Sequence, residues 1–223
     1  MARPPRVDFD GAYHHVMNRG ANHQLIFLDD SDRLLFLAVV AEAVSRFGLE
    51  VHAYCLMPNH YHLLVRCPNA QLSRAMKHIG QVYTQRFNRR HDRDGALFRG
   101  RFHSILVDSE RYLDTVARYI HLNPVTGNMP NQDILDSFDW SSFAAYEGRA
   151  KAPSWLSQRE VLYRFTTSAA YSAFVRARRI DVVATSFYAS PFTQRRVLGD
   201  RGFVTKADER SGRPRSGLKP GMG

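Results

Sequence analysis

Two histidines separated by one residue, His60 and His62, lie in an apolar run that is typical of a β-strand. Side chains alternate between the two faces of a strand, so both imidazoles are expected on one face, with Tyr61 and Leu63 on the other. Two imidazoles side by side on rigid backbone are well placed to bind one divalent metal ion. The alternative is a pair of surface or hydrogen-bonded histidines with a structural role, and the pair alone is compatible with both interpretations.

A tyrosine and an asparagine later in the chain could complete such a site. Tyr119 and Asn123 lie four residues apart in a segment expected to be helical, and this spacing places them on one helix face. His60, His62 and Asn123 could hold Mg²⁺ or Mn²⁺, with two imidazoles favouring Mn²⁺. The Tyr119 phenol could then attack a phosphorus atom beside the metal. The alternative is that Tyr119 packs against a sheet and Asn123 only ends the helix before Pro124.

Composition indicates a globular protein with a polyanionic partner. The chain has 223 residues and a formal net charge of +10. Its arginines are interleaved with aromatic and amide side chains, which favours nucleic acid over a membrane surface; the alternative is a basic surface that only confers solubility. We expect no membrane span and no signal peptide, and we expect Cys55 and Cys67 to be buried free thiols. These features predict a cytoplasmic, nucleoid-associated protein.

Residues 1–138 are predicted to form one α+β domain. Apolar alternation and turn signals predict strands over residues 11–18, 51–57, 60–66 and 101–107. Helices are predicted to begin near Asp30 or Ser31 and end at Gly48, to run over 72–89, and to follow a cap at Asp108 or Ser109. This order of elements favours an antiparallel sheet with helices packed on one face.

The buried faces of the first two helices follow from the spacing of their apolar residues. The first helix is expected to bury Leu34, Leu35, Leu37, Ala38, Ala41 and Val44. The second is expected to bury Leu72, Met76, Ile79 and Tyr83.

A helical C-terminal extension is predicted over residues 139–205. Short helices are indicated at Ser157-x-x-Glu160, at Ser168 to Arg179 and at Ser190-Pro191. Residues 206–223 are rich in Gly, Pro, Arg and Ser and have almost nothing to bury. They are therefore predicted to form a disordered basic tail.

Several motifs resemble the single-tyrosine HUH transposases, in their REP-associated branch. The run from Pro58 to His62 resembles the histidine strand of that family, and the run from Arg118 to Val125 resembles its nucleophile helix. The similarity extends over residues 8–205 through His15-Val16, Arg19-Gly20, Leu97 to Phe102, Trp140-Ser141-Ser142, Leu198-Gly199-Asp200 and Phe203-Val204. One departure is Asn123, because insertion-sequence relatives usually have Gln at this position.

The resemblance implies a ferredoxin-like fold that cuts single-stranded DNA carrying palindromic hairpins of the REP type. Tyr119 would become linked to a 5′-phosphate and release a 3′-OH, and a second attack would rejoin strands without ATP. His60, His62 and Asn123 would be the metal ligands, and the protein would be a monomer or a homodimer. Two alternatives are an HUH replication initiator or relaxase, and a hairpin-binding protein that no longer cuts.

DNA contacts are expected from basic and amide side chains near the first strand, on the second helix and in the loop that follows it. These residues are Arg19, Lys77, Gln81, Gln85, Arg86, Arg89, Arg90, Arg99 and Arg101. The alternative is a solvated helix face.

Three further residues have side chains that could act near the proposed site. Tyr112 is a candidate second nucleophile, although it lies about 10 Å from Tyr119 along the helix axis. His15 is expected to be a hydrogen-bonded strand residue. His121 is expected on the surface, pointing away from Tyr119.

Overall fold

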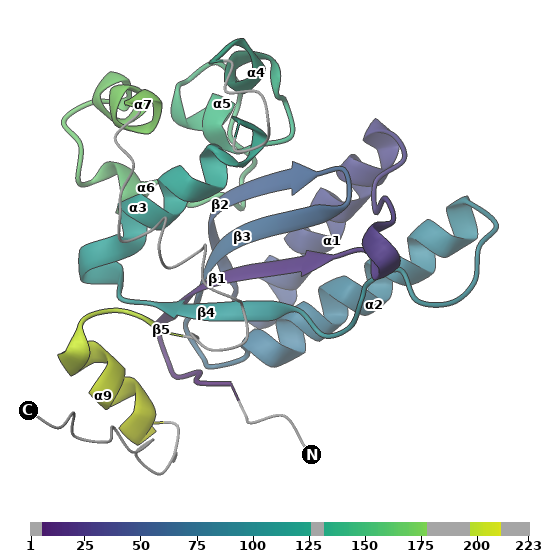
Figure 1. Cartoon of the computed structure of the whole chain (residues 1–223), viewed down its shortest axis with the longest axis horizontal. Coiled ribbons are helices and arrows are strands. Elements are labelled where there is room, and N and C mark those ends of the chain that lie inside the picture. Colours follow the sequence, from purple (N-terminus) through teal and green to yellow (C-terminus); the bar gives the residue numbers. More distant parts are fainter. Residues whose placement is uncertain (1–5, 126–131, 178–196, 211–223) are drawn as a thin grey trace, which may run out of the picture.

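The computed structural model describes residues 6–125, 132–177 and 197–210. Within these residues the strands form one sheet in the order β2-β3-β1-β4-β5 (Figure 1). The strands are β1 (Ala12–Arg19), β2 (Glu50–Met57), β3 (His60–Cys67), β4 (His103–Val107) and β5 (Val197–Leu198). All neighbouring pairs are antiparallel except the short β4–β5 pair. With helices α1 (Asp30–Phe47) and α2 (Leu72–Arg90) after β1 and β3, this is the predicted ferredoxin-like fold.

Helices cover both faces of the sheet. Helices α1 and α2 pack on one face, and α3 (Ser109–His121) packs on the other with helices of the C-terminal extension (Figure 1). Helix α4 (Gln132–Ser137) follows η2 near the end of the predicted domain, and the described extension helices are α5 (Phe143–Tyr146), α6 (Arg159–Leu162) and α7 (Ser168–Arg176). The prediction of one covered face was wrong because the strands are apolar on both sides. Leu63 belongs to the core under α1 and α2, whereas Leu64 belongs to the core under α3.

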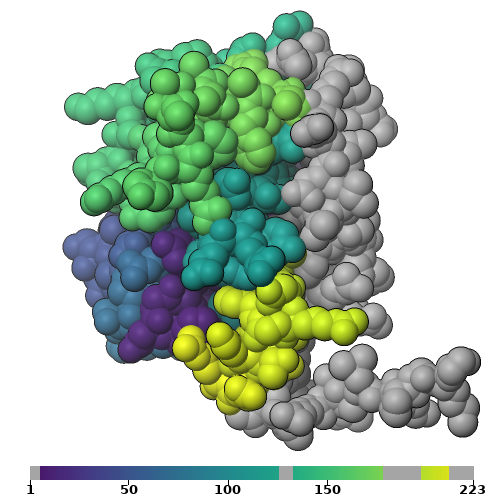
Figure 2. Space-filling view, turned by 90° about the vertical axis from the view of Figure 1, so that its left-hand side faces the viewer, coloured from purple at the N-terminus to yellow at the C-terminus, as the bar shows by residue number. Residues whose placement is uncertain are grey.

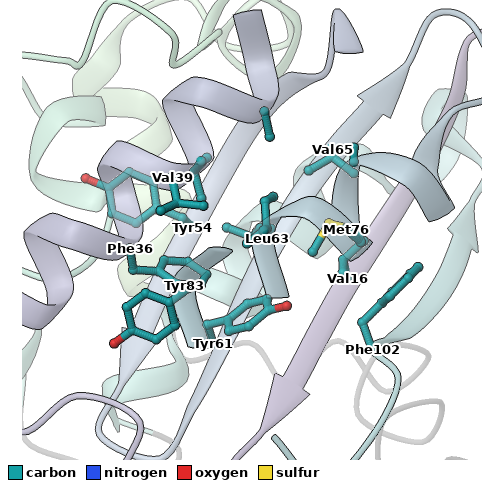
Figure 3. Close-up of a cluster of buried hydrophobic side chains, with 14 of the residues drawn as sticks. Val16, Phe36, Val39, Tyr54, Tyr61, Leu63, Val65, Met76, Tyr83 and Phe102 are labelled. Carbon is teal, nitrogen blue, oxygen red and sulfur yellow. The ribbon is translucent and has the colours of Figure 1, made fainter. Parts of the chain in front are cut away.

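The core under α1 and α2 is rich in aromatic rings (Figure 3). The ring of Phe36 lies 4.7 Å from that of Tyr61 and 5.1 Å from that of Tyr83, measured between centroids. The predicted face of α2 is confirmed, since Leu72, Met76, Ile79 and Tyr83 are all buried.

The predicted face of α1 was wrong. Its buried apolar residues are Phe36, Val39, Val40 and Ala43, while Leu34 is 60% exposed. Apolar residues occur almost all round this helix, so their spacing does not fix its rotation. The rotation is set by tertiary packing, in which the Phe36 ring fits between Tyr61 and Tyr83.

The helices begin and end at or next to the residues that were expected to cap them. Asp29, one residue before the expected cap, caps α1 by accepting a hydrogen bond from the Asp32 amide. Gly48 ends α1 with a φ of 63°, a left-handed conformation that favours glycine. Asp108 caps α3 as predicted, through its bond to the Glu110 amide. Two 3-10 turns, η1 (Ala21–His23) and η2 (Asn123–Val125), follow β1 and α3.

The C-terminal extension is continuous with the sheet. The Ser142 amide donates to the Tyr54 carbonyl at 3.0 Å, and the Ser157 amide donates to the Val51 carbonyl at 2.8 Å. In Figure 2 the green extension and the yellow α9 (Arg201–Arg210) lie on either side of the teal α3 segment. Because α9 continues past residue 206, the first part of the expected tail is helical. Residues 211–223 and the expected helix start at Ser190-Pro191 lie outside the described residues.

Cys55 and Cys67 are buried free thiols, as predicted. Among the described helices, none combines the length and apolar character needed to cross a membrane.

Candidate active site

His60, His62, Tyr119 and Asn123 come together on the α3 face of the sheet. The centroid of the His62 ring lies 5.1 Å from that of His60 and 5.9 Å from that of Tyr119. Tyr61, between the two histidines, points into the opposite core, as the alternation of the strand requires. The strand β3 therefore presents both imidazoles toward the helix that carries Tyr119.

Helix α3 places Tyr119 and Asn123 beside the histidines because of its amphipathic sequence. Leu113, Val116, Ala117 and Ile120 are buried against the sheet and hold the helix on it. Tyr119 lies in the last turn of α3, and Asn123 begins the 3-10 turn η2 that follows. The Asn123 amide donates to the Tyr119 carbonyl at 3.2 Å, and its side chain lies close enough to the His60 ring and the Tyr119 phenol to affect the pKa of both.

Burial controls the protonation of these side chains. It lowers the pKa of His60 and lowers that of His62 well below its ordinary value, so both rings are neutral at neutral pH. Neutral imidazole is the form that binds metal. Burial also raises the pKa of the Tyr119 phenol, and the hydrogen bond from Asn123 opposes that rise. The phenol is therefore protonated at rest and must lose its proton to act as a nucleophile.

The hydrogen bonds of the two histidines fit a metal-binding role. His60 Nδ1 lies 2.7 Å from Asn59 Oδ1, and His62 Nδ1 lies 2.9 Å from His15 Nε2. With both Nδ1 atoms engaged, Nε2 is the atom of each ring that would bind a metal. No cluster of three or more His, Cys, Asp or Glu suited to a metal is found in the described parts of the chain. The Asn123 amide oxygen is thus the third donor that these residues offer.

Tyr112 and Tyr119 differ in their surroundings. Both are partly buried against the α3 core, in which Leu113 and Val116 pack. The Tyr119 ring makes edge contacts with the rings of His15 and His62, at centroid distances of 5.7 and 5.9 Å. Tyr119 is therefore the tyrosine that the fold brings to the histidine pair.

His121 is fully buried, so its expected surface position was wrong. Its Nε2 lies 2.8 Å from Ser142 Oγ, and its Nδ1 lies 2.7 Å from the Tyr171 hydroxyl. The Tyr54 amide donates to the same Ser142 oxygen. This chain of hydrogen bonds ties α3 to the extension and to β2. The burial of His121 could not be predicted from its helix position, because the helices that cover it come from a distant part of the chain.

We expect His121 to make stability sensitive to mild acid. Burial lowers its pKa from 6.5 to about 3, so between these values only the unfolded state binds the proton. Stability is then fully present above pH 6.5 and falls by about 1.4 kcal/mol per pH unit below it. His121→Gln cannot titrate, so its deficit relative to wild type should shrink by about 2 kcal/mol between pH 7.5 and pH 5.

Urea unfolding of the wild type and His121→Gln at both pH values measures this difference directly. The other buried histidines are common to both proteins and cancel in the comparison. A deficit that is the same at pH 7.5 and pH 5 would mean that His121 is protonated normally in the folded protein.

Three of the expected DNA contacts lie at the end of β1, next to His60. Arg19 is the β-ladder partner of His60, and its charge contributes to lowering the pKa of that ring, after the larger effect of burial. The Arg99 amide donates to the Arg19 carbonyl at 2.9 Å. Arg101 follows Gly100, whose carbonyl accepts a hydrogen bond from Asn18. Both Arg99 and Arg101 are exposed.

Two other expected contacts are engaged in ion pairs with α1. The Arg86 guanidinium lies 2.6 Å from a Glu42 carboxylate oxygen. The Arg90 guanidinium lies 2.8 Å from both Asp29 and Asp32, and Asp32 is fully buried. These two arginines help to join α2 to the start and the middle of α1.

The remaining expected contacts lie on α2, which covers the sheet face opposite Tyr119 (Figure 1). They are exposed on that helix and comprise Lys77, Gln81, Gln85 and Arg89. The fold thus divides the expected DNA contacts between two sides of the molecule.

Comparison with known proteins identifies the family. The family model described as "Transposase IS200 like" matches residues 8–123, which include every residue of the candidate site. The chain belongs to the IS200-like transposases. No curated protein matches the sequence.

Among solved structures, this IS200-like transposase is similar to a REP-associated tyrosine transposase bound to a REP hairpin. The TM-score is 0.56 at 16% identity, covering 70% of this chain and 92% of the other, so the likeness concerns the fold. A transposase candidate from Deinococcus radiodurans gives a TM-score of 0.39 at 17% identity, covering 53% of this chain and 95% of the other.

Proposed function

We propose that this transposase is a metal-dependent single-strand DNA endonuclease and strand transferase with Tyr119 as its nucleophile. The observation that carries the proposal is the meeting of Tyr119, Asn123 and the His60–His62 pair on one face of the sheet. The IS200-like family supplies the reaction class, since its members are DNA-processing transposases.

In the proposed reaction the Tyr119 oxygen attacks a backbone phosphorus and the bond to the 3′ oxygen breaks. The phenol gives up its proton and the departing 3′ oxygen takes one up, so the products are a 5′-phosphotyrosine and a free 3′-OH. The reverse attack by a 3′-OH restores the phosphodiester and releases Tyr119, so the step needs no external energy source. Asn123 assists by a hydrogen bond that favours the ionised phenol.

His60, His62 and Asn123 are the proposed ligands for Mg²⁺ or Mn²⁺. When bound, the metal would supply Lewis-acid polarisation of the phosphate and charge stabilisation at the departing oxygen. The protein holds the two rings neutral by burial and orients them through Asn59 and His15.

We propose that the substrate is single-stranded DNA that carries a hairpin of the REP type. Support comes from the structurally similar transposase, which was solved with a REP hairpin. The net charge of +10 also suits a polyanionic partner.

A denaturing gel tests the proposal. The protein is incubated with a 5′- or 3′-labelled hairpin oligonucleotide with single-stranded flanks, with Mn²⁺, with Mg²⁺ or with EDTA. We expect a covalent protein–DNA adduct with either metal and none in EDTA, and activity should return when metal is restored. Hairpin binding without any adduct would instead identify a binding protein that does not cut, and undiminished cleavage in EDTA would exclude the metal mechanism.

The basic residues lie on two sides of the molecule, and we expect those beside His60 to contact DNA at the candidate site. Replacing Arg19 and Arg99 together by Ala should weaken hairpin binding and reduce the dependence of log Kd on log salt by about 0.7 for each lost phosphate contact. Lys77→Ala is the matched control, because Lys77 is exposed on α2 across the sheet from Tyr119. Filter-binding or fluorescence titrations over a salt series measure both quantities. Equal losses from Lys77→Ala would place DNA across the α2 face as well.

A further inference from the structure

His15 is a fully buried histidine on β1 that contacts the candidate site without being one of its proposed ligands. Its Nε2 lies 2.9 Å from His62 Nδ1. Its ring centroid lies 5.1 Å from that of His62 and 5.7 Å from that of Tyr119. In the β1–β3 ladder His15 is opposite Leu64, and His62 is opposite Met17, so the two rings meet diagonally across the strands.

The hydrogen bond between His15 and His62 holds one proton, and its position decides which atom of His62 is available. A separation of 2.9 Å between the two nitrogens requires one N–H donor and one bare acceptor, so a single proton lies between them. A neutral ring has one N–H and one bare nitrogen. If His62 donates from Nδ1, its Nε2 is bare; if His15 donates from Nε2, His62 carries its proton on Nε2 and cannot bind a metal through that atom.

The tautomer of His60, the other proposed histidine ligand, is set by its hydrogen bond to Asn59. Its Nδ1 lies 2.7 Å from the side-chain oxygen of Asn59, which can only accept a hydrogen bond. His60 must therefore donate from Nδ1, which leaves Nε2 without its proton. For His62 also to keep its Nε2 without a proton, His15 Nε2 must accept the hydrogen bond from His62 Nδ1.

We propose that His15 is a positioning residue that holds His62 in the tautomer with its proton on Nδ1 and its Nε2 bare. This inference rests on the proposed function, because it assigns the bare Nε2 to metal binding. A phenylalanine could fill the same buried volume, but it would leave His62 Nδ1 without a partner in a dry environment. The histidine thus supplies an acceptor that packing alone would not require.

The test begins with the metal-free protein. Long-range ¹H–¹⁵N correlation spectra of protein labelled at histidine report which ring nitrogen of His62 is protonated. We compare the wild type with His15→Gln, whose amide oxygen can take the place of Nε2 as acceptor, and with His15→Phe, which keeps a ring and has no acceptor. Wild type and His15→Gln should show His62 protonated at Nδ1, whereas His15→Phe should show a substantial population protonated at Nε2.

Mn²⁺ affinity is then measured by the EPR signal of free Mn²⁺, without DNA. We expect about 10- to 100-fold weaker binding for His15→Phe, and binding close to wild type for His15→Gln. Thermal melts establish that each variant is folded at the temperature used. His62 protonated at Nε2 in the wild type would overturn the inference even if neither variant folded. An unchanged tautomer and unchanged affinity in folded His15→Phe would overturn it too.

His60→Ala separates this inference from the proposed function. That variant should lose Mn²⁺ affinity while His62 remains protonated at Nδ1, because the contact with His15 is intact. If the wild type bound no Mn²⁺ at all, the proposed metal site would fail, and the tautomer of His62 would still decide the role of His15.

Discussion

Tyr119→Phe should abolish the covalent protein–DNA adduct and leave hairpin binding almost unchanged. The substitution removes the phenol oxygen, which is the proposed nucleophile, so we expect adduct formation to fall by on the order of 10⁴-fold or more. The ring itself stays, and with it the edge contacts to His15 and His62. Affinity for DNA depends mainly on phosphate contacts by basic side chains, none of which is altered.

Tyr112→Phe is the matched control for this experiment. It removes the same atom from the same helix, two turns away and against the same core. We expect it to form adduct at nearly the wild-type rate. The measurement is the rate of adduct formation on a denaturing gel, together with hairpin affinity for each variant. An adduct that survives in Tyr119→Phe and disappears in Tyr112→Phe would move the nucleophile to Tyr112.

The sheet and the histidine pair could be predicted from the sequence because both depend on local patterns. Alternation along residues 60–66 determined which side chains share a face, and the short turn at Pro58-Asn59 indicated the β2–β3 hairpin that the structure contains. The four-residue spacing of Tyr119 and Asn123 likewise determined that both reach the same region. Each of these inferences needs only the geometry of one element or one hairpin.

Features that depend on contacts between distant segments could not be predicted in this way. His121 is buried by Ser142 and Tyr171, which lie in the extension, so its helix position alone gave the wrong environment. His15 is 47 residues from His62 in sequence, and their hydrogen bond follows from the register of β1 against β3. A strand prediction does not supply that register.

The positions of the expected DNA contacts on the surface likewise could not be predicted from local sequence. Composition and spacing grouped the basic residues of α2 with those near β1, but the fold places α2 on the face opposite Tyr119. Arg86 and Arg90 also form ion pairs with carboxylates of α1 and of its cap residue. Their charge therefore has a structural role that the sequence alone does not distinguish from DNA binding.

His60→Ala and His62→Ala should each reduce adduct formation by on the order of 10² to 10⁴-fold, because each removes a proposed ligand and a source of orientation for the metal. Asn123→Ala should cost less. Asn123→Gln should keep part of the activity, since its longer amide resembles the residue usual in insertion-sequence relatives. Rates of adduct formation over a Mn²⁺ titration measure all four variants, and weakened ligation should appear as a higher Mn²⁺ requirement.

The effect of these substitutions on folding stability must be separated from their effect on metal binding. His62→Ala leaves His15 Nε2 without its buried partner, which we expect to cost about 1–3 kcal/mol of stability. The substitution His60→Ala should cost less stability, because His60 is less deeply buried. Urea unfolding without metal measures that cost, and adduct assays are run where every variant is folded. A ligand role predicts that Mn²⁺ raises the melting temperature of the wild type but not of His60→Ala or His62→Ala. Full activity in either alanine variant, at the wild-type Mn²⁺ concentration, would remove that histidine from the metal site.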